Sequence, residues 1–141
     1  MLQILLIEDD TIEVMKFVKV TENTGLKHQI IETRNGEDAL KFLNNTKQLP
    51  DIIVLDLNMP KMNGLEFLKE LRQDPELRSI SVFVMTTSND DRDRIDAYDL
   101  NVAGYILKPV SFEKFVSAVS ILSSYWKLCE PLEIPSCFSK N

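Results

Sequence analysis

The feature that most constrains the fold is a series of short, continuous apolar segments separated by helical patterns. The clearest of these segments are 4–7, 52–55, 82–85 and 102–107. Each is apolar at consecutive positions, which is typical of strands that are covered on both faces of a sheet. A fifth segment, 28–33, is apolar only at Ile30 and Ile31, and this wetter pattern suits a strand at the edge of a sheet.

Apolar side chains recur at helical spacing between these segments. The spacing is seen at Ile12, Met15 and Val18, at Ala39, Leu40 and Leu43, and at Leu65, Leu68 and Leu71. The third helix should end near Asp74-Pro75, a charged helix is expected over 89–100, and Ser111 is the expected N-cap of a last helix that runs to Trp126. A strand followed by a helix, five times over, predicts an α/β fold: a doubly wound, five-stranded parallel sheet with helices on both faces.

Length and charge exclude several classes of protein. A chain of 141 residues can bury a substantial core as one domain, and its 44% apolar content argues against disorder. Acidic residues outnumber basic ones by 22 to 16, whereas a nucleic-acid-binding domain needs a basic face. His28 is the one histidine, so a metal site built from several imidazoles is excluded. Cys129 and Cys137 both lie near the end, and we interpret them as thiols of a reducing compartment.

The two ends of the sequence set the expected domain limits. The first residues carry no basic leader and run directly into Glu8-Asp9-Asp10, so we expect no signal peptide, no membrane partner and a cytoplasmic location. One domain is expected over 1–126. An irregular tail is expected over 127–141, without a separate output domain.

Polar side chains follow four of the expected strands, at the point where each strand ends. Glu8 and Asp9 follow the first strand, and Asp56 follows the third. The fourth strand ends in Thr86-Thr87-Ser88 and the fifth in Lys108-Pro109. Because ligands of an open α/β sheet bind at the carboxyl ends of its strands, we expect these side chains to meet in one site.

The chemistry of this set indicates phosphoryl transfer. Crowded carboxylates repel one another, so they either raise a pKa or hold a cation. The ligand atoms are all oxygens, which predicts a hard cation, Mg²⁺ with Mn²⁺ as the alternative. A cation, the Lys108 ammonium and the Thr86 hydroxyl suit a phosphoryl group, and Asp56 is then the candidate nucleophile. Each residue alone has a simpler explanation, such as Asp10 as a helix N-cap, but the combination does not.

These motifs identify a resemblance that covers Leu2 to Trp126. The chain resembles the receiver domain of two-component response regulators. The segments that carry the resemblance are Ile4 to Asp10, Asp51 to Pro60 with Asn63-Gly64-Leu65, Met85 to Ser88, and Gly104 to Pro109. The resemblance implies a flavodoxin-like sheet with strand order 2-1-3-4-5.

The resemblance also implies a role for each matching residue. Asp56 would be the phosphoacceptor, and Lys108 would bind a phosphoryl oxygen, with a cis bond to Pro109. Thr86 and Tyr105 would be the switch residues that move a surface formed by the fourth helix, fifth strand and fifth helix. The implied metal ligands are Glu8, Asp9, Asp56 and the backbone carbonyl of Asn58.

Three positions depart from the family pattern or vary within it. Glu8 stands where aspartate is commoner, a change expected to loosen the water geometry around the cation without abolishing Mg²⁺ binding. Asn58 and Ser88 lie where family members differ and where the lifetime of the phosphoryl group is tuned.

The expected partners follow from the same resemblance. A sensor histidine kinase or a histidine phosphotransfer protein would supply the phosphoryl group, and the small regulators of bacterial phytochrome-type kinases are similar to this chain. In the last helix Phe112, Phe115, Val116, Val119 and Leu122 form one apolar stripe. A second stripe, Ala118, Ile121 and Tyr125 with Trp126 beyond, predicts a homodimer, unless the tail folds back over it.

Three alternative functions remain open at this point. A phosphatase of the haloacid-dehalogenase kind would also use Asp56, but such enzymes carry a second aspartate where this chain has Asn58. A flavin or nucleotide carrier needs a phosphate-binding loop after the first strand, where Glu8-Asp9-Asp10 would repel phosphate. A receiver that works as a constitutive interaction module keeps the fold without the phosphorylation, and the complete set of site residues argues against it.

Overall fold

The computed structural model describes residues 1–23 and 27–130, in which strands and helices alternate. The strands are β1 (Leu2–Ile7), β2 (His28–Thr33), β3 (Ile52–Leu55), β4 (Ser81–Thr86) and β5 (Gly104–Leu107). The helices are α1 (Thr11–Glu22), α2 (Gly36–Asn45), α3 (Gly64–Gln73), α4 (Asp91–Asp99) and α5 (Phe112–Leu128). All strand pairs are parallel, and the order β2-β1-β3-β4-β5 confirms the predicted sheet.

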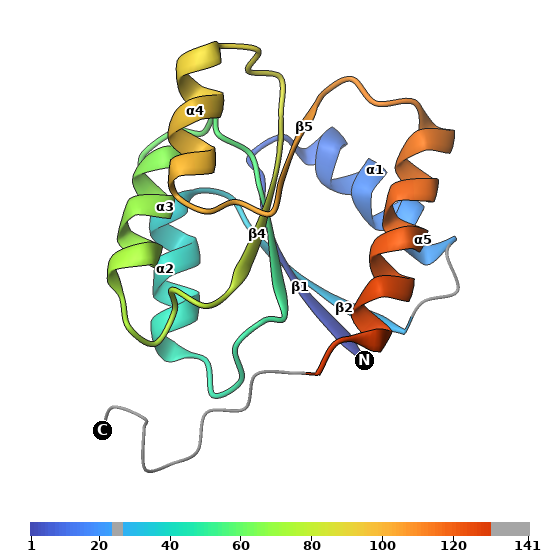
Figure 1. Cartoon of the computed structure of the whole chain (residues 1–141), viewed down its shortest axis with the longest axis horizontal. Coiled ribbons are helices and arrows are strands. Elements are labelled where there is room, and N and C mark those ends of the chain that lie inside the picture. The colour runs from blue at the N-terminus through green and yellow to red at the C-terminus, as the bar shows by residue number, and fades with distance from the viewer. Residues whose placement is uncertain (24–26, 131–141) are drawn as a thin grey trace.

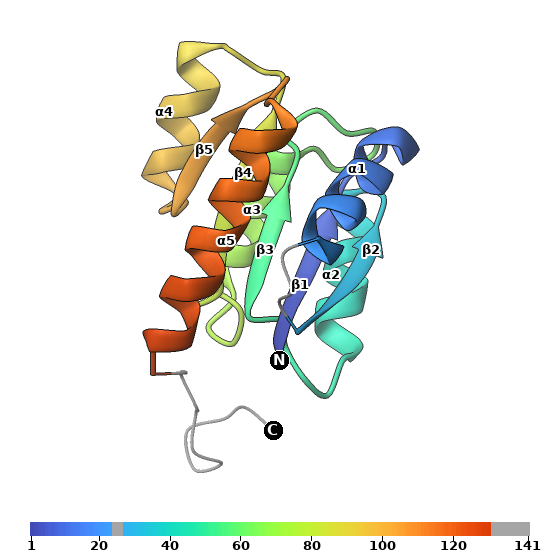
Figure 2. The same cartoon turned by 90° about the vertical axis from the view of Figure 1, so that its right-hand side faces the viewer.

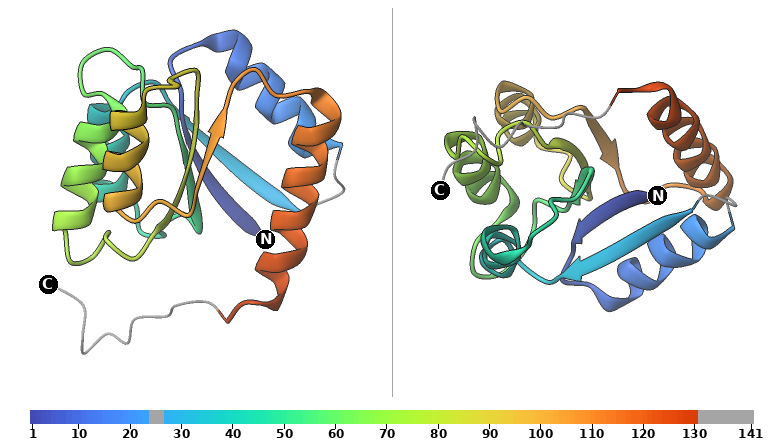
Figure 3. Two further views of the ribbon diagram at one scale, coloured as in Figure 1. Left: turned by 45° about the horizontal axis from the view of Figure 1, so that its top comes forward. Right: turned by 90° about the horizontal axis from the view of Figure 1, so that it is seen from below.

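Helices cover both faces of the sheet, as the views in Figures 1 and 3 show. α1 and α5 lie side by side on one face, and α2, α3 and α4 lie on the other. Leu5 and Phe67 belong to the apolar core under α2–α4, whereas Ile4 and Phe17 belong to the core under α1 and α5. Consecutive residues of one strand thus enter different cores, which explains the continuous apolar segments of the sequence.

The register of the central strands brings their carboxyl ends to one edge (Figure 2). Ile7 of β1 pairs with Leu55 of β3, and the Asp56 amide donates a hydrogen bond to the Ile7 carbonyl at 3.1 Å. Glu8 and Asp56 therefore leave neighbouring strands at the same level. β2, the wetter strand, lies at one edge of the sheet as predicted.

Side-chain caps start the helices that border this edge. Asp10 caps α1 by accepting the Ile12 amide at 2.9 Å, and Ser111 caps α5, both as predicted. Asn63 caps α3 in a reciprocal capping box with Glu66. α5 extends two residues beyond the expected end at Trp126, to Leu128, because nothing in 127–128 breaks a helix.

Helix α4 is the least anchored of the five. Ala97 is its one buried residue, and the helix is shorter than the expected 89–100 because Asp90 already acts as its N-cap. The turn after it is held by Arg72 of α3, whose guanidinium donates to the carbonyls of Leu100 and Asn101 at 2.7 and 3.1 Å. The fold therefore fixes the end of α4 more firmly than its body.

The last helix carries the two predicted stripes. Val119 is buried, and Phe115, Leu122 and Trp126 pack against the core under α1 and α5. Trp126 thus faces inward, although the sequence placed it beyond the second stripe. Residues 131–141 of the expected tail, with Cys137, lie outside the described residues. Over 1–23 and 27–130, no helix combines the length and apolar character needed to cross a membrane.

Candidate functional site

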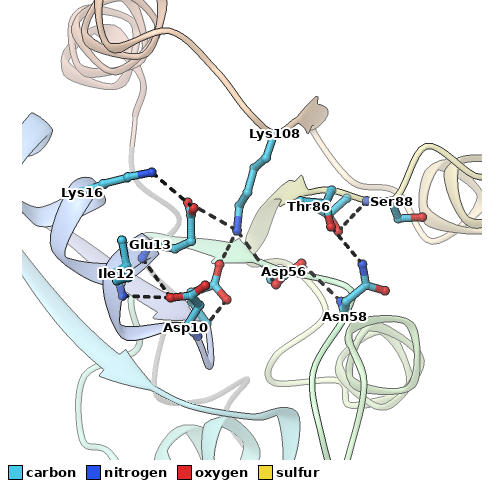
Figure 4. Close-up of polar contacts among 11 residues, drawn as sticks. Asp10, Ile12, Glu13, Lys16, Asp56, Asn58, Thr86, Ser88 and Lys108 are labelled. Carbon is cyan, nitrogen blue, oxygen red and sulfur yellow. Dashed lines mark hydrogen bonds and ion pairs between the residues drawn. The ribbon is translucent and has the colours of Figure 1, made fainter.

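The polar residues that close four strands meet at one edge of the sheet. Glu8 follows β1, Asp56 follows β3, Thr86 ends β4 and Lys108 follows β5. Figure 4 shows the Lys108 side chain reaching from the end of β5 toward Asp56, with Thr86 on the far side of Asp56. The structure therefore brings together the residues that the sequence singled out.

Three carboxylates form the centre of the site. Carboxylate oxygens of Glu8, Asp9 and Asp56 lie within 4.8 Å of one another. Glu8 and Asp56 are buried, with 4% and 8% of their surfaces exposed, and Asp9 is open to solvent. Three oxygen donors in a group that opens on one side suit a hard divalent cation, which could keep part of its water shell.

Lys108 is the cation that balances these carboxylates in the structure. Its ammonium forms a close ion pair with Glu8 and lies 3.9 Å from an oxygen of Asp56. It also lies 3.8 Å from Glu13 of α1, a residue that the sequence analysis did not include. The sequence could have indicated Glu13, because a residue three positions after the N-cap Asp10 lies on the first turn of α1, next to the end of β1.

Burial and charge shift the ionisation of this pair. Burial raises the pKa of Glu8 to about 7, and the negative charge of Asp56 adds to the effect, while the Lys108 hydrogen bond opposes it. Burial disfavours the charge of Lys108, but its bond to Glu8 and the charges of Asp56, Glu8 and Glu13 outweigh burial and raise the Lys108 pKa. Lys108 therefore keeps its charge, and Glu8 binds a proton more readily than an exposed glutamate.

The loop after β3 holds Asp56 in place. The Asn58 amide donates to the Oδ1 atom of Asp56 at 3.2 Å, and the Asn58 side-chain amide reaches the Thr87 hydroxyl at 3.4 Å. Gly64, the first residue of α3, donates its amide to the Leu57 carbonyl at 3.0 Å. The loop thus closes on the start of α3, with Asp56 oriented toward the open edge.

Gly64→Ala is expected to lower the free energy of unfolding by about 1–3 kcal/mol, the usual cost of overpacking. A Cβ atom there would lie 2.6 Å from the Leu57 Cα and 2.7 Å from the Asp56 carbonyl oxygen, so backbone would have to move. Gly104→Ala is the matched control, because its Cβ would meet only the Phe83 ring, at 3.5 Å. Urea denaturation of both variants measures the difference, and equal effects at the two glycines would contradict the prediction.

Ser88 joins the two expected switch residues. The buried Thr86 hydroxyl accepts the Ser88 amide at 3.2 Å, and the Tyr105 hydroxyl donates to the Ser88 carbonyl at 2.9 Å. The Ser88 hydroxyl donates to Asp93 of α4 at 2.7 Å, and Arg94 lies over the Tyr105 ring, 5.4 Å from its centre. The site edge, β5 and α4 are therefore linked through one residue. Ser88 was expected only as a variable position. Arg94 was not expected in the site, because the sequence of a charged helix does not indicate which residue packs against an aromatic ring.

The predicted cis peptide bond is also present between Lys108 and Pro109.

Comparison with known proteins shows the family of this chain. The profile of the response regulator receiver domain matches residues 4–120. The chain belongs to the response regulator receiver family.

Relatives of this receiver domain agree over nearly the whole chain. It is 36% identical over 127 residues to the probable methanogenesis regulatory protein FilR2 of Methanothrix harundinacea, covering 87% of this chain and 82% of that protein. It is 34% identical over 128 residues to the response regulator Rcp1 of Synechocystis sp., covering 87% of each chain. The family match does not depend on a single motif, because residues 4–120 contain all four strand ends.

Solved structures place this receiver domain close to small regulators. The Mn²⁺-bound form of the response regulator Rcp1 superposes with a TM-score of 0.81 at 32% identity, covering 95% of this chain and 100% of that one. The phosphorylated cyanobacterial phytochrome response regulator RcpA gives 0.80 at 31% identity, covering 89% and 94%. A divalent cation at the Glu8, Asp9 and Asp56 cluster is consistent with both the oxygen donors here and the metal-bound relative.

Proposed function

We propose that this receiver accepts a phosphoryl group on Asp56 from a phosphohistidine of a sensor kinase or phosphotransfer protein, in the cytoplasm. The observation that carries the proposal is the position of Asp56. It is buried, it shares a cluster with two other carboxylates, and it lies 3.9 Å from the Lys108 ammonium. Figure 4 shows Asp56 between Lys108 and Thr86.

The transfer step uses groups that the site contains. A carboxylate oxygen of Asp56 attacks the phosphorus, a P–O bond forms, and the P–N bond to the histidine breaks with its electron pair leaving on the imidazole nitrogen. Lys108 offers its ammonium to the charge on the transferred oxygens. Thr86 offers a hydroxyl to the same group once it turns from the Ser88 amide.

The proposed resident cation is Mg²⁺, with Mn²⁺ as the alternative. Glu8, Asp9, Asp56 and the backbone carbonyl of Asn58 would hold it. When bound, the cation neutralises phosphoryl oxygens and so lowers the repulsion between Asp56 and its phosphodonor. The donor set fits, because it consists of oxygens and has one face open to water.

Raising the pH from 6 to 8 is expected to strengthen Mg²⁺ binding by about tenfold, because Glu8 keeps its proton up to about pH 7 and a cation needs the carboxylate. Calorimetric titrations in two buffers of different ionisation enthalpy measure both the affinity and the protons released. Glu8→Gln should bind more weakly and lose this pH dependence. Equal affinities of the unchanged protein at pH 6 and pH 8 would contradict the assignment of Glu8.

Incubation with acetyl phosphate tests the proposed function directly. One phosphoryl adduct that requires Mg²⁺, seen by intact-mass spectrometry, is the expected result. If no adduct forms, a beryllofluoride complex that depends on Mg²⁺ would indicate rapid self-dephosphorylation. Absence of both would leave a receiver that acts as a constitutive interaction module and would overturn the proposal.

The proposed output is a change in a protein-binding face. Phosphorylation would draw Thr86 away from the Ser88 amide, and Ser88 also binds Tyr105 and Asp93. Because α4 is held by a single buried residue, a few new charge-assisted bonds can shift its population between two positions. The receiver would then signal through the face of α4, β5 and α5. The proposed domain, expected to span 1–126, ends with α5 at Leu128, and the tail follows it.

A homodimer through α5 is part of this proposal. Ile121, Tyr125 and Leu128 lie on one helix face and are 69%, 63% and 85% exposed. Ile121→Glu with Leu128→Glu is expected to convert a dimer to a monomer by light scattering, because two charges would be buried in the interface. Ser120→Glu, on a different face, is the control. A mass that stays monomeric at every concentration in the unchanged protein would reject the dimer.

A further inference from the structure

A groove of about 970 Å³ lies at the end of the sheet opposite to the phosphorylation site. Its floor is made by the amino ends of the strands, including Leu2, Asp51 and Ser81. Its wall is the end of α5, including Tyr125, Trp126 and Glu130. The groove is unrelated to the phosphoacceptor, because none of the proposed site residues lines it.

The groove is large and partly apolar for a surface without a partner. Pockets that hold a whole small ligand are roughly 300–1,000 Å³, so this one has room for several side chains. Trp126 packs with one part of its surface against the core under α1 and α5, and with another part it lines the groove. Trp126 would gain burial from an occupant.

The position of Glu130 indicates which segment could occupy the groove. Glu130 is the last described residue and is itself part of the groove wall, so the chain continues from the edge of the groove. The helix has already ended there, since Cys129 has extended backbone angles, φ −80° and ψ 141°. The next residues, 131–141, reach at most about 40 Å when fully extended, far more than is needed to lie along a groove that begins at their first residue.

The sequence of 131–141 suits this role. Leu132, Ile134 and Phe138 supply apolar side chains, and Pro131 and Pro135 favour an extended chain over a helix. The prolines also reduce the entropy that the segment would lose on docking. A segment tethered at the groove has an effective concentration in the millimolar range, so docking in its own groove needs no second copy of the chain.

We propose that residues 131–141 dock in this groove of their own chain, with Leu132, Ile134 and Phe138 packing against Trp126 and the amino ends of the strands. The docked segment acts as a strap that ties the end of α5 to the sheet. It shields the one tryptophan of the chain, which makes the contact measurable.

A paramagnetic label on Cys137 tests the contact in the full chain. Cys129→Ser leaves Cys137 as the one thiol to label, and serine preserves the bond that the Cys129 thiol donates to the Tyr125 carbonyl. With the strap docked, the amide signals of Lys27, Asp51 and Ser79 on the groove floor should lose most of their intensity. Reduction of the label should restore them.

Variants of the segment separate docking from simple tethering. Ile134→Asp with Phe138→Asp should restore the three amide signals in the labelled protein and raise the quenching of Trp126 fluorescence by acrylamide. Ser139→Asp, a polar position of the same segment, should change neither measurement. Equal broadening in the double variant and the unchanged segment would overturn the proposal.

A mixed sample distinguishes the two sources of the segment. Isotope-labelled chains without the spin label are mixed with spin-labelled chains that carry no isotope. No broadening is expected, because the strap occupies its own groove. Broadening of the Lys27, Asp51 and Ser79 signals in this mixture would show that the segment docks on a second copy, and it would overturn the intramolecular proposal.

Discussion

Asp56→Asn is expected to abolish phosphoryl incorporation from acetyl phosphate. The substitution replaces the attacking carboxylate with an amide, which is a poor nucleophile and carries no negative charge to face Lys108, 3.9 Å away. Asparagine has nearly the same shape, and its side-chain oxygen can still accept the Asn58 amide that Asp56 accepts at 3.2 Å. The fold should therefore survive, and intact-mass spectrometry should detect no adduct.

Asp10→Asn is the matched control for this substitution. Asp10 lies at the same edge of the sheet and carries the same group, but its Oδ1 caps α1 by accepting the Ile12 amide. Asparagine caps helices as well as aspartate does, so this variant should be phosphorylated normally. An adduct on Asp56→Asn equal to that on the unchanged protein would place the acceptor elsewhere.

Lys108→Met is expected to slow phosphorylation about 100- to 1,000-fold, the usual effect of removing one group that stabilises developing charge. Methionine keeps most of the apolar stem and removes the ammonium that pairs with Glu8 and faces Asp56 and Glu13. At pH 9, where Glu8 is ionised without the Lys108 bond that lowers its pKa, the same change should strengthen Mg²⁺ binding, because a competing positive charge leaves the carboxylates. A misfolded variant would lose both the phosphorylation and the Mg²⁺ binding. Slower phosphorylation together with tighter Mg²⁺ binding would therefore identify the role of the Lys108 charge.

Lys16→Met provides the comparison for Lys108. Lys16 pairs with Glu13 at 3.7 Å on the surface of α1, and its side chain is 66% exposed. An exposed pair of this kind contributes little, so neither the phosphorylation rate nor the Mg²⁺ affinity should change. If Lys108→Met were phosphorylated as fast as Lys16→Met, Lys108 would have no part in the transfer.

The sheet, and the site at the carboxyl ends of its strands, could be predicted because both depend on the local pattern of apolar and polar residues. Residues 52–55 are apolar at each position and form β3 with those limits, and the polar residue that follows, Asp56, marks the strand end. The same reasoning located Thr86 and Lys108. Parallel strands deliver their carboxyl ends to one edge, so the order of elements was sufficient to bring the side chains together.

Contacts between side chains of different elements could not be predicted in this way. Glu13 faces Lys108 from α1, and Arg94 covers the Tyr105 ring from α4. Both are charged residues on helices, and their sequence pattern is the same as that of a solvated face. The inward packing of Trp126 could not be predicted for a similar reason. The spacing of apolar residues in α5 shows which of them share a helix face, but not how the helix is rotated against α1.

The weak anchoring of α4 has a consequence for how such proteins diversify. Ala97 is the one buried residue of this helix, so positions other than Ala97, Asp93 and Arg94 can be exchanged at a cost of only a few tenths of a kcal/mol each. Arg72 holds the following turn through backbone carbonyls, which every residue type provides. The proposed recognition surface can therefore change residue by residue, while the residues around Asp56 stay the same. Duplicated copies of such a gene could acquire different partners without first acquiring a new fold.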